Sequence, residues 1–457
     1  MGAMTEDDVA SWLCDQASMA DGPSTDMGSM EKEIDRLSRE CRRRALESLV
    51  QKNIARQEMI CPICHGALRV EARRRQRRVL TAWGIIGLTR DYGFCPRCVR
   101  HFYPADARLG LHDRAPTSPR VQELCALTAL RAPAGQAQED VRRLTGVDLD
   151  ASTLHREARR QGERALARRD GDEPLTQSPS GVAVLASRAT RLPSAFTLII
   201  EIDAWNIRER DNWGQSQSFR KTGQDTGRWH WVYTATVFRL DQRATTASGR
   251  PMITERGFVA TRRGLESFQR QLYAESLQRG LLTAQTVLIL GDGAVWIWNI
   301  AKDRFKDAHQ RVDLHHVQQH LWSLAHQLHG QGTADAELWV RPYLLDLERS
   351  NNGAQKVIEG LEQLNATVRK LTSDQREAID RQIHYFQEHK HRMDYKNGKK
   401  LGQPVGSGAI ESTCSQYQRR FKLTGQFWSL AGDEAFLALA TLHRNGRWHH
   451  LFPHDHG

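Results

Sequence analysis

Residues 196–203 read Phe-Thr-Leu-Ile-Ile-Glu-Ile-Asp, an apolar run that ends in a carboxylate. Short runs of aliphatic and aromatic residues are typical of buried strands. A second such run, Thr286-Val-Leu-Ile-Leu290, leads directly into Gly291-Asp292-Gly293. Asp203 and Asp292 therefore stand where two predicted core strands end.

Other elements surround these two strands in a recognisable order. They are expected, in sequence, as strands at 229–238 and 257–261, a helix at 264–278, the strand at 286–290, a short helix at 294–302, an edge strand at 310–312 and a helix at 314–328. Three adjacent strands, a helix, a fourth strand and further α/β elements are typical of an RNase H-like domain.

The remainder of this half is predicted to be helical. Residues 333–400 contain few strand formers, and Gly406-Ser-Gly-Ala-Ile-Glu411 opens a helix that reaches about residue 423. We therefore expect an RNase H-like catalytic domain in two parts, 190–325 and 403–450. An all-helical insertion, 326–402, separates them.

Three acids in this half suit metal-dependent phosphodiester chemistry. Two Mg²⁺ or Mn²⁺ ions about 3.5–4 Å apart activate a nucleophile and neutralise a leaving oxygen. Hard cations need carboxylate oxygens on a rigid scaffold. Asp203, Asp292 and Glu411 supply such a set. Each acid alone reads equally as a helix N-cap, a turn residue or a solvated side chain, so the hypothesis depends on their combination.

The helix that begins near Glu411 has two distinct faces. Ile410, Cys414, Tyr417 and Phe421 form a core stripe, so Cys414 is interpreted as a packing residue. The next face carries Glu411 together with residues that could serve phosphate oxygens beside the metals: Gln418 and Lys422, close to Arg419 and Arg420.

Other polar and aromatic residues allow two interpretations. Asp313 and His316 either support the active site or are a helix N-cap and a surface residue, and His320 is open to the same reading. No Glu accompanies the histidines in a zinc-protease pattern. Seven tryptophans are expected mostly in the core, with one or two free to stack on unpaired bases: Trp213, Trp229, Trp231, Trp296, Trp298, Trp322 and Trp428.

The cysteine spacing in the first half predicts a zinc site. Cys61 and Cys64 form one C-x-x-C pair, and Cys95 and Cys98 form another. Two such knuckles complete a closed, tetrahedral, structural Zn²⁺ site, so residues 59–108 are predicted to be a zinc ribbon with strands at 77–81 and 88–92. A thioredoxin-like redox pair is the alternative, but its βαβ context is missing.

Basic residues are concentrated in two parts of the first half. The ribbon contains Arg73, Arg74, Arg75, Arg77 and Arg78, which read either as a solvated hairpin edge or as a finger that contacts phosphates. Three short helices are expected over 115–170, and the last carries Arg156, Arg159 and Arg160. These helices resemble a helix-turn-helix DNA-binding domain, although an ordinary helical subdomain fits nearly as well.

Composition limits the broad class. The chain has 457 residues, 65 Lys plus Arg against 54 Asp plus Glu, and a net charge of +11. A basic body attracts polyanions, most often nucleic acid. No long apolar run or secretory signal is present, so a cytoplasmic, nucleoid-associated location without membrane contact is expected. Residues 1–29 are acidic and expected to be disordered, and 30–58 to be helical. The expected class is multidomain α+β.

Several of these motifs together resemble a known family. The cysteine knuckles, Leu290-Gly-Asp292-Gly293, Asp313-Leu-His-His316-Val, and Gly406-Ser-Gly-Ala-Ile-Glu411-Ser-Thr-Cys414 with Gly425 and Trp428 resemble bacterial insertion-sequence DDE transposases. The most similar group is the ISKra-type enzymes, distant kin of Mutator-like transposases, and the resemblance covers roughly residues 30–450.

The resemblance implies a function and assigns residues to it. Asp203, Asp292 and Glu411 resemble the DDE triad, and Asp313 with His316 resembles the D-x-x-H motif of the wider kin. Implied activities are binding of terminal inverted repeats, Mg²⁺-dependent exposure of a 3′-OH, and strand transfer into target DNA. The expected partners are double-stranded DNA and further copies of the chain, as a homodimer or higher oligomer. A non-catalytic DNA-binding regulator and an RNase H-like nuclease without strand transfer remain alternatives.

Overall fold

The computed structural model describes residues 6–18, 26–111, 115–210, 227–249, 251–368 and 370–453. The fold is mixed α+β and mostly helical, and the chain divides into two compact units. Unit 1 comprises residues 1–162 with 449–457, and unit 2 comprises 163–448. Trp213, one of the tryptophans named above, lies outside the described residues.

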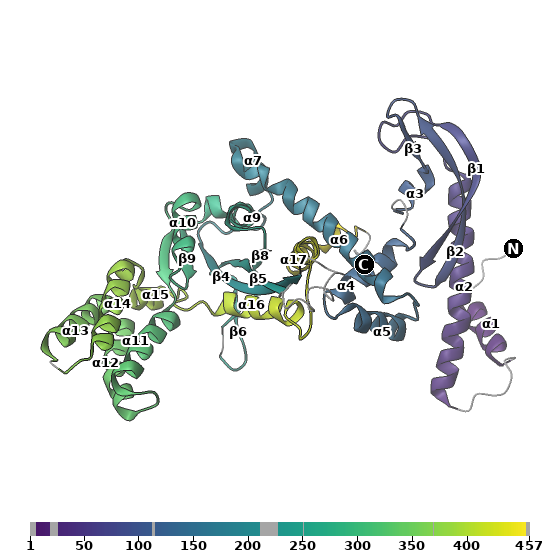
Figure 1. Cartoon of the computed structure of the whole chain (residues 1–457). Helices are drawn as coiled ribbons and strands as arrows, with labels where there is room; N and C mark the ends of the chain where they lie inside the picture. Colours follow the sequence, from purple (N-terminus) through teal and green to yellow (C-terminus); the bar gives the residue numbers. More distant parts are fainter. Residues whose placement is uncertain are drawn as a thin grey trace, which may run out of the picture. The chain divides into compact units, whose positions relative to one another are not determined.

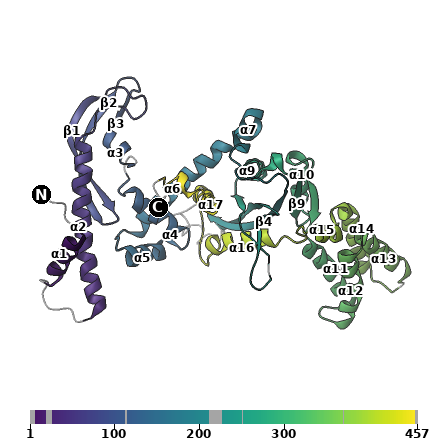
Figure 2. The ribbon, with the colours of Figure 1, turned by 180° about the vertical axis from the view of Figure 1, so that it is seen from behind.

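Unit 1 begins with a long helix packed on an antiparallel sheet. Helix α2 (Met27–Ala55) runs along β1 (Arg69–Thr81) and β2 (Gly84–Cys95), as both Figure 1 and Figure 2 show. The short β3 (Arg100–Phe102) pairs with β2 and is followed by α3 (Pro104–Arg108). Leucine, isoleucine and valine side chains from α2 and the hairpin form the core: Leu46, Val50, Ile54, Val79, Ile86 and Leu88.

The prediction for the first 58 residues is partly correct. The helix expected at 30–58 is present as one continuous helix, and its N-cap Asp26 accepts from the Ser29 amide at 3.0 Å. The expectation of disorder over 1–29 is wrong for Glu6–Ser18, which forms α1 and contacts α2. Low hydrophobicity argued for disorder, but the neighbouring helix offers a surface on which this segment folds.

Three helices follow the sheet, as predicted. They are α4 (Pro119–Ala129), α5 (Ala134–Thr145) and α6 (Ala151–Asp172). The start of α6 was expected at Ser152 and Thr153, but Asp150 caps the helix by accepting from the Thr153 amide at 2.8 Å. The glycines and prolines of residues 170–181 predict a linker, but the structure has η1 (Pro174–Gln177) and α7 (Pro179–Ala186) there. Ser178 is the N-cap of α7, and Pro179 follows in the first turn.

Unit 2 is built on a five-stranded mixed sheet. Its strands are β4 (Thr197–Arg210), β5 (Gly227–Arg239), β8 (Gly257–Thr261), β9 (Thr286–Gly291) and β10 (His309–Val312), in the order β10-β9-β4-β5-β8. Strand β5 runs antiparallel to both β4 and β8, whereas β9 is parallel to both β4 and β10. All five predicted strands are present, and a small hairpin of β6 (Arg243–Thr245) and β7 (Pro251–Ile253) adds to them.

Helices cover both faces of this sheet (Figure 1). On one face, α9 (Leu265–Gln278) and α10 (Val295–Arg304) pack against Ile200, Ile202 and Ala235. The other face is covered by α16 (Gly408–Phe421) and α17 (Leu430–Arg444), with Trp205 stacked on Tyr417 at a centroid distance of 6.5 Å. Because side chains alternate along a strand, odd-numbered residues of β4 face α16.

The segment 326–402 is helical in its described part, as predicted. It contains the last four residues of α11 (Leu314–His329), then α12 (Ala334–Arg349), α13 (Gly353–Thr367), α14 (Ser373–His389), η3 (Lys390–Arg392) and α15 (Tyr395–Lys400). Helix α14 starts with a capping box between Thr372 and Gln375. The helix α17, inside the expected part 403–450, was not foreseen as a separate element.

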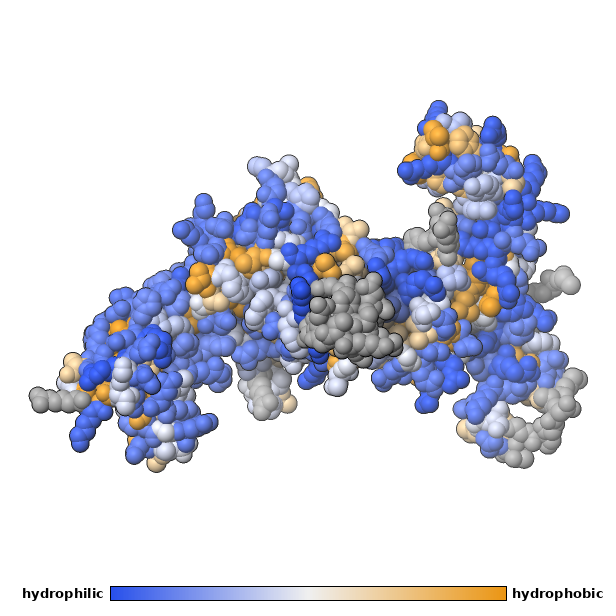
Figure 3. Space-filling model, in the orientation of Figure 1, coloured by the Kyte–Doolittle hydropathy of each residue, from blue (hydrophilic) through white to orange (hydrophobic). Residues whose placement is uncertain are grey.

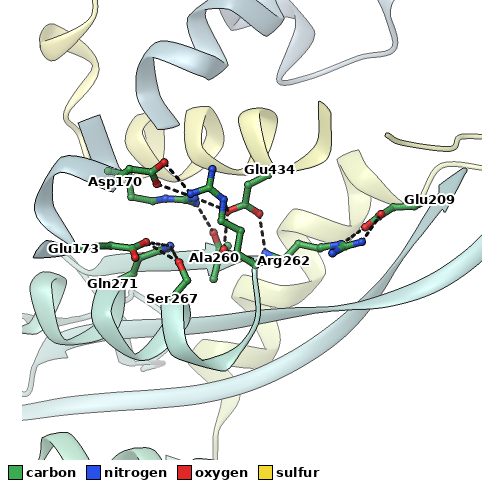
Figure 4. Close-up of polar contacts among 11 residues, drawn as sticks. Asp170, Glu173, Glu209, Ala260, Arg262, Ser267, Gln271 and Glu434 are labelled. Atoms are coloured by element: carbon green, nitrogen blue, oxygen red, sulfur yellow. Dashed lines mark hydrogen bonds and ion pairs between the residues drawn. The ribbon is translucent and has the colours of Figure 1, made fainter. Parts of the chain in front are cut away.

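A buried ion-pair network joins α17 to the sheet (Figure 4). The Arg262 guanidinium donates to both carboxylate oxygens of Glu209, and its backbone amide donates to Glu434 at 2.8 Å. Glu434 also accepts from Arg169 of α6 and from the Thr261 hydroxyl. Buried charges need such partners, so this network fixes α17 in one position.

No helix in the described ranges is both long enough and apolar enough to cross a lipid bilayer. On the face drawn in Figure 3, hydrophilic residues cover most of the described surface.

Candidate functional site

The register of the sheet brings Asp203 and Asp292 side by side. In the parallel pair β4 and β9, Glu201 lies opposite Leu290, and each aspartate follows its partnered residue by two positions. Both therefore lie on the face that α16 covers. Asp292 directly follows the carboxyl end of β9, whereas β4 continues past Asp203 to Arg210, so the expectation that Asp203 ends its strand is wrong. Burial raises the pKa of Asp203 above its ordinary value, and the negative charge of Asp292 acts in the same direction.

Short hydrogen bonds hold these two carboxylates in place. The Ala204 amide donates to Asp203 Oδ1 at 2.7 Å, and the Ala294 amide donates to Asp292 Oδ1 at 2.9 Å. The Oδ2 atom of each aspartate takes part in neither of these two hydrogen bonds. A Cβ on Gly291, the last residue of β9, would lie 2.6 Å from Ile297 Cδ1, so a larger residue here would require the buried Ile297 side chain to move.

Helix α16 presents Glu411 on the same side of the sheet. Glu411 lies exposed in the first turn, and the Ser407 hydroxyl donates to Glu411 Oε1 at 3.3 Å. One turn later the Cys414 thiol lies beside Asp203. Burial, followed by the charge of Asp203, raises the pKa of the Cys414 thiol, so this thiol stays neutral. Its position on the buried stripe is the one predicted.

Two fully buried carboxylates position the start of α16. Asp313 is the N-cap of α11, where it accepts from the His316 amide at 2.9 Å, and its other oxygen accepts from the Ser407 amide. Glu201 accepts from the Ile410 amide at 2.9 Å, and burial raises the pKa of Glu201 to about 8. Asp313 thus acts as the N-cap that was one of its two readings, and it also fixes the loop before Glu411.

Sequence reasoning missed Glu201. It lies inside the apolar run at 196–203, where a charged residue at a position with 1% exposure is itself an unusual signal. A buried acid in a core strand must find hydrogen-bond donors, and the open amides at a helix N-terminus supply them.

The helical segment contributes side chains near Asp292. A Cβ placed on Gly293 would lie 3.5 Å from the Tyr385 hydroxyl of α14. Tyr385 stacks on His320 with centroids 3.9 Å apart, and its hydroxyl is buried without a hydrogen-bond partner. Burial and then the charge of Asp292 raise the pKa of Tyr385. His316 and His320 also line a groove of about 400 Å³ between α11 and α14.

Several donors expected beside the acids lie elsewhere. Helices rise 1.5 Å per residue, so Lys422 is about 16 Å and Gln418 about 10 Å along the helix axis from Glu411. The expectation that Lys422 borders the metals is therefore wrong. Arg420 was expected to contact DNA, but it is 8% exposed and packs over Trp428 at 5.2 Å. Arg419 remains exposed.

The three acids do not form a single compact ion site. Within the described ranges, only the four cysteines meet the criterion of three or more ligand atoms that all lie within 4.8 Å of one another. Two ions about 3.5–4 Å apart spread their ligands more widely than one ion does. Asp203, Asp292 and Glu411 do not meet this 4.8 Å criterion in the structure.

The four cysteines of unit 1 could bind a structural metal such as zinc. Sulfur atoms of Cys61 and Cys98 are 3.8 Å apart, and those of Cys64 and Cys95 are 3.5 Å apart. Four sulfurs about 2.3 Å from a tetrahedral zinc would be about 3.8 Å from one another. Thiolates are the required ligand form, and although burial opposes it, backbone amides lower the pKa of Cys61 to about 7.

A basic groove lies between α2 and the ribbon hairpin. It has a volume of about 1080 Å³ and is lined by cationic and polar side chains that include Arg44, Lys52, Arg74 and Arg78. Arg73, Arg74, Arg75 and Arg78 are exposed, as a phosphate-contacting surface requires. Arg77 differs, because it forms a buried ion pair with Asp106 at 2.7 Å. Its assignment to DNA contact is therefore wrong.

The arginines named on helix α6 differ in their burial. Arg156 and Arg159 are exposed, whereas Arg160 is half-buried and pairs with the buried Glu157 at 2.9 Å. Two of the three arginines named on this helix thus point to solvent.

The chain was compared with known proteins. No protein-family model matches it, and no curated protein matches its sequence.

Proposed function

We propose that this protein is a DNA transposase of the DDE type. The observation that carries the proposal is the adjacency of Asp203, inside β4, and Asp292, at the carboxyl end of β9, on the face where α16 presents Glu411. Acids from two neighbouring core strands and one covering helix are a suitable carboxylate set for phosphodiester chemistry.

The sheet order supports an RNase H-like catalytic domain. Numbered along the chain, the five strands lie in the order 3-2-1-4-5, with strand 2 antiparallel to strands 1 and 3. This arrangement fits residues 190–325 and 403–450 as the two parts of the domain, with 326–402 as a helical insertion. The position of Asp292 beside α14 supports a role for that insertion at the site.

Some residues of the site would bind the metal ions, and others position those ligands. Divalent magnesium or manganese ions, when bound, would activate a hydroxyl nucleophile and stabilise the leaving oxygen. Asp203, Asp292 and Glu411 would hold these ions. Glu201 and Asp313 keep Glu411 in position through the backbone of α16 and of the loop before it. The half-buried setting of Asp203 reduces competition from bulk water.

DNA binding would fall to unit 1 and to the exposed arginines. The cysteine cluster supports a zinc ribbon, and α4 to α6 support a helix-turn-helix-like domain whose third helix is basic. The exposed arginines of β1 and α6 suit contacts to the phosphates of transposon ends and target DNA. Assembly as a homodimer or larger oligomer on DNA and a nucleoid location complete the proposal.

The test uses the purified full-length protein and a supercoiled plasmid that carries the DNA flanking its own gene. With Mg²⁺, we expect nicking at defined positions and joining of the new 3′-ends to target DNA. Glu411→Gln should retain DNA binding and lose both reactions. Glu359→Gln, on an exposed position of α13, is the matched control and should remain active.

Each alternative gives a different result in this assay. Cleavage without joining identifies a nuclease, and binding without metal-dependent nicking identifies a regulator. Full activity of Glu411→Gln would contradict the assignment of the site.

A further inference from the structure

The sheet of unit 2 extends beyond the helices that cover it. On β5, Tyr233 packs against Phe268 and Trp296 with centroids 5.8 and 5.2 Å away. The next two residues on the same face are Trp231 and Trp229, which are 55% and 59% exposed. Large aromatic side chains rarely remain exposed in neighbouring pairs, so this pair marks a binding surface.

Two cationic side chains lie close to the ring of Trp229 but not to the ring of Trp231. The Arg208 guanidinium lies 5.9 Å and the Lys422 ammonium 5.5 Å from the centre of the Trp229 ring. Trp231, in contrast, has no ring or cation partner in the described part of the chain. Arg210 lies nearby, over the ring of Phe427 at 3.6 Å.

We propose that Trp231 and Trp229, with Arg208 and Lys422, form a stacking platform for unpaired bases of single-stranded DNA. A base has an apolar ring face and is flanked by negatively charged phosphates. An open indole beside two cations complements both features. A protein partner would need no such alternation of ring and cation. The platform deepens the proposed function, because Lys422 directly follows the helix that carries Glu411.

The platform gives a role to the contact between Lys422 and Trp229, which has no part in the proposed catalysis. Lys422 lies too far from Glu411 to serve the metals, but it is exposed and stands over Trp229. Trp231 and Trp229 lie on the face of the sheet that α9 and α10 cover, and Lys422 reaches Trp229 from the end of α16, which covers the other face.

The test measures binding in the absence of Mg²⁺, by fluorescence anisotropy on the full-length protein. Two labelled strands are compared, a 16-nucleotide oligo(dT) and the same backbone with abasic residues throughout. Stacking is worth about 1–3 kcal/mol per base, so we expect oligo(dT) to bind about five- to 150-fold more tightly. Equal affinity for the two strands would overturn the proposal.

Variants separate stacking from charge. Trp231→Ala should abolish the preference for bases, and Trp231→Phe should restore much of it. Lys422→Gln should weaken both strands alike, because it removes a phosphate contact. Trp12→Ala, which changes a tryptophan of α1 that is 41% exposed, is the control and should behave as the wild type. An unchanged preference in Trp231→Ala would refute the platform.

The platform and the proposed function can fail separately. If the wild type prefers bases but does not nick DNA with Mg²⁺, the platform is supported and the transposase function is refuted. If it nicks DNA but shows no preference for bases, the transposase function is supported and the platform is refuted. Glu411→Gln should lose nicking and keep the full base preference.

Discussion

Replacing Glu201 with glutamine should stabilise unit 2 in a pH-dependent way. Glu201 is 1% exposed, and burial raises its pKa from 4.5 to about 8. The neutral carboxyl is therefore the form that the fold favours. As the pH rises from 4.5 towards 8, the unfolded chain ionises Glu201 while the folded protein does not, so the wild type loses stability across this window.

The magnitude follows from the shift in pKa. One pKa unit corresponds to about 1.4 kcal/mol, so the wild-type penalty grows by up to about that amount per pH unit and reaches roughly 3 kcal/mol at pH 7. Glutamine has nearly the same shape and cannot ionise, and its carbonyl can still accept from the Ile410 amide. Glu201→Gln should match the wild type below pH 4.5 and exceed its stability increasingly above that value.

Urea unfolding at pH 5, 6, 7 and 8, followed by the fluorescence of buried tryptophans such as Trp205, measures this difference. Glu201→Ala is the contrasting variant. It leaves the Ile410 amide buried without an acceptor, which should cost about 1–3 kcal/mol at every pH, in addition to the cavity. Parallel pH profiles for the wild type and Glu201→Gln would refute the assignment of a neutral Glu201.

Three further predictions concern other parts of the molecule. Cys61→Ser should lose bound zinc, measured by elemental analysis, while wild-type protein holds one ion per chain. Arg77→Ala should destabilise unit 1 by about 1–3 kcal/mol, because it removes one of the two buried ion pairs of Asp106, which keeps Arg90 as its partner. Arg78→Ala should leave thermal stability unchanged and lower the slope of log affinity for DNA against log salt by about one, and the reverse pattern would contradict their roles. Burial raises the pKa of Asp433 to about 9, so Asp433→Asn should gain stability over the wild type as pH rises from 4 to 9, and thermal melts that show no such gain would count against a neutral Asp433.

The strands and most helices could be predicted from local patterns in the sequence. The apolar runs before Asp203 and Asp292 have a period and length that only buried strands satisfy, and the paired cysteines have a spacing that only a shared centre explains. These features are local in sequence, and the structure shows all of them.

Long-range partners could not be read in the same way. Arg77 looks like its neighbours in an arginine-rich run, and only the folded chain shows that Asp106, 29 residues later, pairs with it. Arg420 and Glu201 are similar cases, because their burial depends on helices far away in sequence. The faces of α16 were predicted correctly, but the distance along the helix was not taken into account for Lys422.

The hydrogen bonds around Asp313 also have a topological consequence. The Asp313 carboxylate holds the Ser407 amide, and the Leu314 amide donates to the Val405 carbonyl at 2.9 Å. Two chain positions more than 90 residues apart are thus joined at the base of the intervening helices. This connection between the two ends of the helical segment does not depend on the length of the segment, but α14 also contacts the site through Tyr385. A different helical module joined at Asp313 would therefore have to replace the contacts of Tyr385 as well as keep the two hydrogen-bonded ends.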